Sequence, residues 1–180
     1  RFSSRATSSP PSVVRSSRSR WLVSLVSDTV MRMAEAAGLS VTDFNLQSDI
    51  PFVEVRKHPW RSLKTSASAR VIPLSGMALW AAQRILHQAD TSPYAFPRYN
   101  RGSHTSANSA SAAINKWLKN YVPTGCTMHS FRHSMRDRLR AVQCPSDVAD
   151  QIGGWATDGV GQGYGSGYPI EVLMEWVKKW

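Results

Sequence analysis

The chain has 180 residues and a hydrophobic fraction of 42%, which is typical of one globular domain and argues against wholesale disorder. Lysine and arginine total 22 against 12 aspartates and glutamates, so the formal net charge is +10. So basic a chain is expected to bind a polyanion, with nucleic acid first and an anionic membrane surface second. No apolar run reaches the ~20 residues of a membrane-spanning helix, which excludes an integral membrane protein of that kind.

The first twenty residues differ from the rest in composition. Residues 1–20 hold five arginines and eight serines but no acidic residue, and we interpret them as a flexible linker or tail. A start of this kind is also typical of an organellar transit peptide, which is the alternative. Because the chain begins with Arg1, we expect a fragment or a trimmed product. Residues 21–180 are predicted to form one domain.

Hydrophobic periodicity and turn residues predict mostly helices after that segment. Apolar residues recur at helical spacing from Trp21 to Ala36, and Gly38 suits the end of such a helix. Alternation predicts a strand at 52–55 and a second at 70–74, joined by a basic hairpin connection. The other predicted elements are a helix at 75–86, a loop at 89–104, helices at 106–121 and 128–142, a short helix from Ser146 to Gly153, a loop at 159–167 and an amphipathic helix from Pro169. The predicted fold class is therefore mainly α, an α+β fold with a small antiparallel sheet near the N-terminal third.

The most informative stretch surrounds His129 and Arg132, which are three residues apart and therefore share one face of a predicted helix. An imidazole can move a proton, and a guanidinium can clamp two oxygens of a phosphate. The same stretch offers a zinc site as an alternative, because Cys126, His129, His133 and Cys144 are all possible ligands. The helix between the two cysteines would hold them too far apart for one tetrahedral site, so no metal is predicted. With only these two cysteines no disulfide framework is expected, and the reducing cytoplasm is the predicted location.

Further motifs accompany this pair in a fixed order. Arg32 opens the sequence R-x-x-E-x-x-G-L, and Lys64 stands shortly before the strand that ends in Pro-Leu. Trp155 follows two glycines, and Tyr164 comes nine residues later in a glycine-rich stretch. Taken together with H-x-x-R, these pieces resemble the catalytic domain of the tyrosine recombinases, the phage integrase family. The resemblance covers about residues 20–180 and implies the helical fold of DNA breaking-rejoining enzymes.

The resemblance implies a site-specific DNA recombinase or integrase that cleaves and rejoins strands through a 3′-phosphotyrosine bond. The implied catalytic residues are Arg32 and Arg132 as phosphate clamps, Lys64 as the acid for the departing 5′ oxygen, His129 for proton transfer, Trp155 as a donor or packing residue, and Tyr164 as the nucleophile. Neither ATP nor a metal nor any other cofactor is implied. The implied partner is double-stranded DNA, with assembly into a tetramer on it and exchange of the C-terminal helix between protomers. A bacterial or phage-encoded protein of the cytoplasm is the implied setting.

Several positions depart from the family pattern. Val30 stands where a glycine often precedes the first arginine, and valine would be strained in a turn that needs a positive φ. Ser130 stands where many members have aspartate, and residues 1–20 do not resemble the family's N-terminal DNA-clamping domain. These departures leave open a catalytically inactive DNA-binding remnant. A type IB topoisomerase-like relaxing enzyme shares the implied chemistry and is the other alternative.

Several of the implied residues also have a plainer interpretation: His129 could be a buried hydrogen-bonded histidine, and Arg132 a surface cation. Arg32 could pair with Glu35 on an exposed helix, and Lys64 could be one more contact to the DNA backbone. Trp155 could serve core packing alone. Tyr168 is a second candidate for the nucleophile, although the spacing from Trp155 favours Tyr164.

Overall fold

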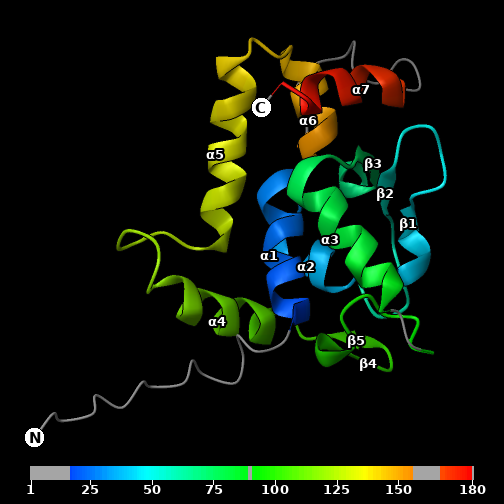
Figure 1. Cartoon of the computed structure of the whole chain (residues 1–180), viewed down its shortest axis with the longest axis vertical. Helices are drawn as coiled ribbons and strands as arrows, with labels where there is room; N and C mark the ends of the chain where they lie inside the picture. Colours follow the sequence, from blue (N-terminus) through cyan, green and yellow to red (C-terminus); the bar gives the residue numbers. More distant parts are fainter. Residues whose placement is uncertain (1–16, 89–90, 156–166, 180) are drawn as a thin grey trace, which may run out of the picture.

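A computed structural model describes residues 17–88, 91–155 and 167–179 (Figure 1). Most of its regular elements are helices, which confirms the predicted mainly α class. The helices are α1 (Ser17–Thr29), α2 (Met33–Ala37), α3 (Gly76–His87), α4 (Ala107–Leu118), α5 (Met128–Ala141), α6 (Ser146–Gly153) and α7 (Ile170–Val177). The strands are β1 (Phe44–Asn45), β2 (Phe52–Val55), β3 (Arg70–Pro73), β4 (Asn100–Arg101) and β5 (His104–Thr105), and short 3-10 turns are η1 (Val41–Asp43), η2 (Ser66–Ser68) and η3 (Pro97–Tyr99).

The larger sheet is antiparallel with the order β1-β2-β3, and it lies near the N-terminal third as predicted. The alternation that predicted β2 is visible in its burial, because Val53 and Val55 are fully buried while Glu54 between them is not. Strand β1 was not predicted, since two residues are too few to show alternation. The predicted loop at 89–104 contains η3 and part of the hairpin formed by β4 and β5.

Two hydrophobic clusters form the core. The first gathers apolar side chains of α1, α2, α3 and α4 and of the larger sheet. The second gathers those of α5, α6 and α7 and also contains Val30, from the turn between α1 and α2. Figure 1 shows α3 in front beside α1, with α5 standing along the other side of α1. Helix α7 buries Leu173, Met174 and Val177 in the second cluster and packs against β3 of its own chain.

The run predicted as one helix from Trp21 to Ala36 is broken into α1 and α2. The break lies at Val30, which has a φ of +60° and is fully buried. Because Cβ crowds the following carbonyl in this conformation, it costs a non-glycine residue about 1–2 kcal/mol. The turn also directs the Val30 carbonyl to the guanidinium of Arg132, which donates a hydrogen bond to it. The predicted helix end at Gly38 is confirmed as the C-cap of α2.

The beginning of α1 differs from the predicted boundary of the tail. Helix α1 starts at Ser17, so residues 17–20 are helical although they were included in the flexible segment. Residues 1–16 lie outside the described part of the chain, as does most of the predicted loop at 159–167. In the described ranges no helix is both long and apolar enough to cross a membrane.

Two substitutions at Val30 test the strain. Val30→Ala removes buried methyl groups and is expected to lower the free energy of unfolding by about 2 kcal/mol. Val30→Gly also loses the buried Cβ but takes a positive φ without a Cβ clash, so it should be at least as stable as Val30→Ala. Urea unfolding of both variants measures the difference. A glycine variant less stable than the alanine variant would contradict the strained turn, since glycine is normally the more costly of the two.

Candidate active site

The N-terminus of α5 presents His129 and Arg132 on one face, as predicted. The Thr127 hydroxyl accepts a hydrogen bond from the His129 N–H at 3.2 Å, and the Ser130 hydroxyl accepts one from the Thr127 N–H at 3.0 Å. This reciprocal capping box defines where the helix begins and gives Ser130 a local structural role. Near this N-terminus His129 is exposed, whereas Arg132, three residues later, is buried.

The guanidinium of Arg132 connects three parts of the chain. Its Nη1 donates to the Val30 carbonyl, and its Nη2 donates to the Gly153 carbonyl at 2.7 Å. The first carbonyl belongs to the turn after α1, and the second ends α6, where the helix dipole favours a cation. Because a guanidinium has five N–H donors, these two bonds leave donors for a further acceptor.

The indole of Trp155 lies against two guanidinium groups. The Cζ atoms of Arg132 and Arg136 are 4.4 and 4.5 Å from the ring centroid, and Arg136 also donates to the Asp150 carboxylate at 2.8 Å. Such cation–π contacts are favourable when they are shielded from water. Gly153 makes room for the ring, because a Cβ there would lie 2.0 Å from two of its carbons. Trp155 therefore packs beside Arg132 and limits where that guanidinium can lie.

Arg32 precedes α2 and is paired with Glu35. Its Nη1 donates to Glu35 Oε1 at 2.8 Å and to Ser68 Oγ at 3.2 Å, and its backbone N–H donates to Glu35 Oε2 at 2.9 Å. The Glu35 side chain is only 4% exposed and that of Arg32 is 25% exposed. The ion pair of the plainer interpretation is present, but it is not on an exposed helix face, because Glu35 is buried and Arg32 is partly buried.

Arg70, at the start of β3, is a residue that the sequence analysis missed. It is 3% exposed, and its Nη2 donates to Glu35 Oε2 at 3.0 Å. Its Nε donates to the Ile152 carbonyl at 2.9 Å and its Nη1 to the Ser68 carbonyl at 2.8 Å, so the guanidinium is directed at protein groups. Gly154, with a φ of +59°, passes so close that a Cβ would lie 2.7 Å from Arg70 Nη1. The available signal was a charged residue opening an otherwise apolar strand.

Positive charge around Arg132 is only partly neutralised. The pKa of Arg132 is lowered to about 10, first by burial and then by the charges of Arg32 and Arg70. Glu35 acts in the opposite direction but does not offset these effects. A buried group of like charges with too few counter-charges favours an anion beside it.

His129 lies in the same electrostatic field. Although the residue is exposed, partial desolvation of the ring lowers its pKa below the ordinary histidine value, followed by the charges of His133, Arg132, Arg32 and Lys64. The ring of His133 meets that of His129 edge to face, with the centroids 5.0 Å apart. Lys64 is exposed in the connection between β2 and β3. Four of the six predicted residues, from three separate segments, thus lie close enough for the charges of Arg32, Lys64 and Arg132 to act on His129.

Of the two candidate nucleophiles, Tyr168 lies in the described part of the chain. Tyr164 lies in residues 156–166, outside the described residues. The phenol of Tyr168 donates to the Asp147 carboxylate, and Gln151 exchanges hydrogen bonds of 2.7 and 2.9 Å with the Tyr168 backbone. The bond to Asp147 raises the pKa of Tyr168, which makes its phenolate harder to form. The hydrogen bond to Asp147 therefore disfavours Tyr168 as a nucleophile, and Tyr164 stays a prediction.

The two cysteines of the alternative zinc site lie beyond opposite ends of one helix. Helix α5 spans Met128–Ala141 and stands between Cys126 and Cys144. Among the described residues, no group of three or more histidine, cysteine or acidic side chains is arranged to hold a metal ion.

The sequence comparison decides the family. The model of the phage integrase family matches residues 7–166. The chain belongs to the phage integrase family. No curated protein matches it. This family was the one that the ordered motifs resembled, so that identification is confirmed.

Solved structures share the fold of this phage integrase family member. The Tn1549 transposon integrase in complex with circular intermediate DNA has a TM-score of 0.56 at 15% identity, over 81% of this chain and 56% of that one. The XerH site-specific recombinase bound to difH substrate has a TM-score of 0.52 at 17% identity, over 85% of this chain and 43% of that one. The chain thus spans about half the length of the structures it matches. The predicted recombinase-like fold is confirmed.

Neutralising Glu35 is expected to destabilise the protein in a pH-dependent way. Burial raises the pKa of Glu35, but the charge and hydrogen bond of Arg70, followed by the bonds of Arg32, outweigh it and leave the pKa below its ordinary value. Its stabilising contribution is therefore complete above the unfolded-state pKa of about 4.3 and is lost as the pH falls through the lower folded value. Glu35→Gln should lower the free energy of unfolding by about 3–5 kcal/mol near pH 7 and by clearly less near pH 3.

Urea unfolding at both pH values measures this effect. Glu54→Gln is the matched control, because the Glu54 side chain is 44% exposed and should matter by less than about 0.5 kcal/mol. A Glu35→Gln defect that did not shrink in acid would contradict the depressed carboxyl pKa.

An anion is expected to raise the pKa of His129. In its absence the imidazole should titrate below about 6.5, because nearby cations disfavour its charged form. Inorganic phosphate bound beside the arginines would offset those charges and shift the titration upward. NMR titration of the ring protons with and without phosphate tests this, with His104, exposed in β5, as the control whose signals should not respond. No shift at His129 would contradict an anion site here.

Proposed function

We propose that this chain is the catalytic domain of a site-specific DNA recombinase or integrase, which cleaves and rejoins strands through a 3′-phosphotyrosine bond. The observation that carries the proposal is the under-neutralised group of cations around His129, made of Arg32, Lys64 and Arg132. A phosphodiester is the anion that such a group suits, and the matching solved structures are of an integrase and a recombinase in complexes with DNA. Double-stranded DNA is accordingly the proposed partner.

The proposed chemistry begins at the Tyr164 phenol. With a pKa near 10, a tyrosine is only about 0.1% ionised at pH 7, so its proton must be removed as the Tyr164 oxygen bonds to phosphorus. The lowered pKa of His129 supports this role, because it keeps the imidazole neutral and able to accept that proton near neutral pH. As the bond between phosphorus and O5′ breaks, the Lys64 ammonium gives its proton to O5′. No ATP or metal is required by these steps.

The two arginines would act on the phosphate itself. Arg132, whose remaining donors are available beside Trp155, and Arg32 would bind the non-bridging oxygens and stabilise the pentavalent transition state. Loss of one such donor costs on the order of 100–1000-fold in rate. Trp155 contributes by packing against Arg132, and its indole N–H is a further candidate donor.

A DNA-binding protein without activity is the second candidate. It is favoured by the observation that both Arg32 and Arg132 already donate to protein groups, so their roles could be structural. A topoisomerase-like relaxing enzyme shares the proposed residues and would relax supercoiled plasmid without sequence preference. Tetramer assembly and exchange of α7 between protomers stay predictions, since α7 packs here on its own chain.

Substitution of Tyr164 tests the proposal. We expect the protein to form a covalent adduct with members of a nicked, random-sequence duplex DNA library, because a nick lets the cleaved strand diffuse away before rejoining. Denaturing gels detect the adduct, and sequencing the captured DNA identifies a substrate. Tyr164→Phe should abolish the adduct, whereas the matched variant Tyr168→Phe should retain it. DNA binding with no adduct would favour the inactive candidate, and an adduct unchanged in Tyr164→Phe would refute the nucleophile.

A further inference from the structure

We propose that Asp43, His58 and Arg61 are positioning residues that hold the β2–β3 connection so that Lys64 reaches the scissile phosphate. This inference rests on the proposed function and adds residues that the motifs do not contain. The general acid must meet the departing oxygen within hydrogen-bond distance, and a misplacement of about 1 Å can cost 100-fold in rate. An exposed lysine on a connection of fourteen residues, 56–69, therefore needs anchors on both sides.

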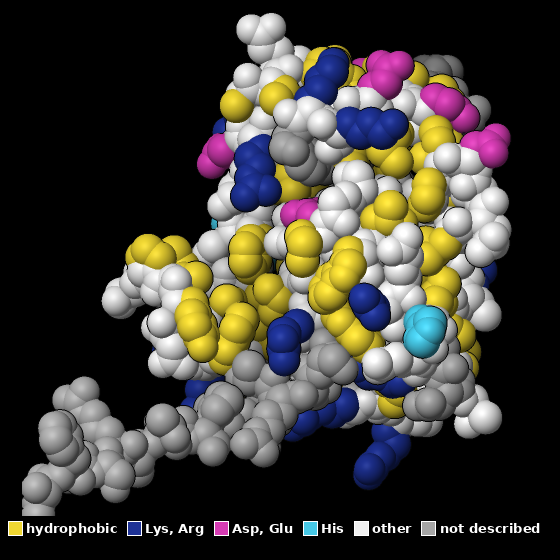
Figure 2. Space-filling view, in the orientation of Figure 1, with side chains coloured by type: hydrophobic (Ala, Val, Ile, Leu, Met, Phe, Trp, Pro, Cys, Tyr) yellow, Lys and Arg dark blue, Asp and Glu magenta, His cyan; other side chains and the backbone are white. Residues whose placement is uncertain are grey.

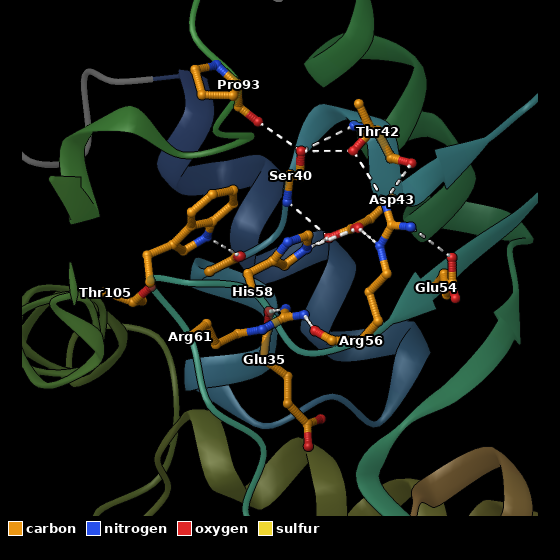
Figure 3. A network of polar contacts seen from close by, with 12 residues as sticks. Glu35, Ser40, Thr42, Asp43, Glu54, Arg56, His58, Arg61, Pro93 and Thr105 are labelled. Atoms are coloured by element: carbon orange, nitrogen blue, oxygen red, sulfur yellow. Dashed lines mark hydrogen bonds and ion pairs between the residues drawn. The ribbon is translucent and has the colours of Figure 1, made fainter. Parts of the chain in front are cut away.

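The first anchor is the buried carboxylate of Asp43 (Figure 3). It accepts hydrogen bonds from the Ser40 N–H at 2.9 Å, from Arg56 Nε at 2.8 Å and from His58 Nε2 at 2.8 Å. The Asp43 side chain is fully buried and that of His58 is 9% exposed. A buried carboxylate with several donors is held firmly, because any donor that left would expose a charge to a low dielectric. The start of the connection is thereby tied to η1.

Stacking and a short bridge hold the next residues. The His58 ring stacks on Trp60, with parallel planes and centroids 4.6 Å apart, and Trp60 meets Tyr94 edge to face at 4.9 Å. The Trp60 Nε1 donates to the Gly38 carbonyl at 3.0 Å. The backbones of His58 and Arg61 exchange hydrogen bonds of 3.0 and 3.2 Å. The chain is therefore folded back on itself just before Lys64.

Arg61 connects this anchor with Glu35, the partner of Arg32. Its Nη1 donates to the Glu35 carbonyl at 2.6 Å and its Nη2 donates to the Arg56 carbonyl, with the residue 3% exposed. The approach is so close that a Cβ at Gly38 would lie 2.6 Å from Arg61 Cδ. Glu35, held here by its carbonyl, is the residue whose carboxylate binds Arg32.

The second anchor lies one residue after Lys64. The Ser68 hydroxyl accepts hydrogen bonds from the Thr65 N–H at 3.4 Å and from Arg32 Nη1 at 3.2 Å, and Ser68 is fully buried. Lys64 therefore lies between a segment fixed through Asp43 and a segment fixed to Arg32. It is exposed and close enough to His129 to lower the pKa of that imidazole.

The test separates the delivery of a proton from general stability. The probe is the nicked duplex identified by sequencing the covalent adduct. It is synthesised with either oxygen or sulfur at the 5′ bridging position of the scissile phosphate. A thiol has a pKa of about 8.5, so a thiolate leaves without a proton and cleavage no longer depends on Lys64. His58→Gln should slow cleavage of the oxygen substrate by about 10- to 100-fold and leave the sulfur substrate at the wild-type rate. Lys64→Ala should show the same pattern, and His87→Gln, exposed at the end of α3, should change neither rate.

A second variant keeps the test independent of folding. Arg56→Ala removes one donor from Asp43 at a side chain that is 42% exposed, and a smaller slowing rescued by sulfur is expected. Two outcomes would overturn the positioning role. One is that a variant cleaves the oxygen and the sulfur substrate equally slowly, and the other is that neither His58→Gln nor Arg56→Ala slows the cleavage of either substrate. A wild-type protein that cleaves neither substrate would overturn the proposed function itself, and with it this inference.

Discussion

One buried carboxylate holds together arginines that would otherwise repel one another. Glu35 accepts charge-assisted hydrogen bonds from Arg32 and Arg70, and its side chain is 4% exposed. Like charges in a low-dielectric interior are tolerated when an opposite charge lies between them. Glu35 does not neutralise the whole group, as the lowered pKa of Arg132 indicates. The positive charge that is left over is the physical basis of the proposed binding of an anion.

The same arginines fasten the two hydrophobic clusters to each other. Arg70 and Arg132 donate to the Ile152 and Gly153 carbonyls, which end α6 and have no partner within that helix. Arg132 also holds the Val30 carbonyl, in the turn between α1 and α2. The geometry of the site and the packing of the domain therefore depend on one set of hydrogen bonds. A substitution there is expected to change stability and chemistry together.

Net charge and useful surface charge are different quantities in this protein. Arg56 and Arg61 add to the basic composition of the β2–β3 connection, yet both donate to groups of the protein itself. Lys64, between the anchored segments, is exposed, and its charge lowers the pKa of His129. Figure 2 shows several acidic side chains toward the end that holds α7, while Lys and Arg side chains are spread over the whole of that face. The composition indicated a polyanion partner but not which charges meet it.

The sequence by itself determined the helices and the order of the motifs, because periodicity, caps and turn residues act between near neighbours. The capping box at Thr127 and the alternation of β2 are of this kind, and so is the placement of His129 beside Arg132. Tyr164 as the nucleophile stays a prediction. Only the tertiary structure decided the break at Val30, whose carbonyl is met by a guanidinium 102 residues away. Long-range partners of this sort leave no local pattern in the sequence, because their free energy appears only when distant segments pack.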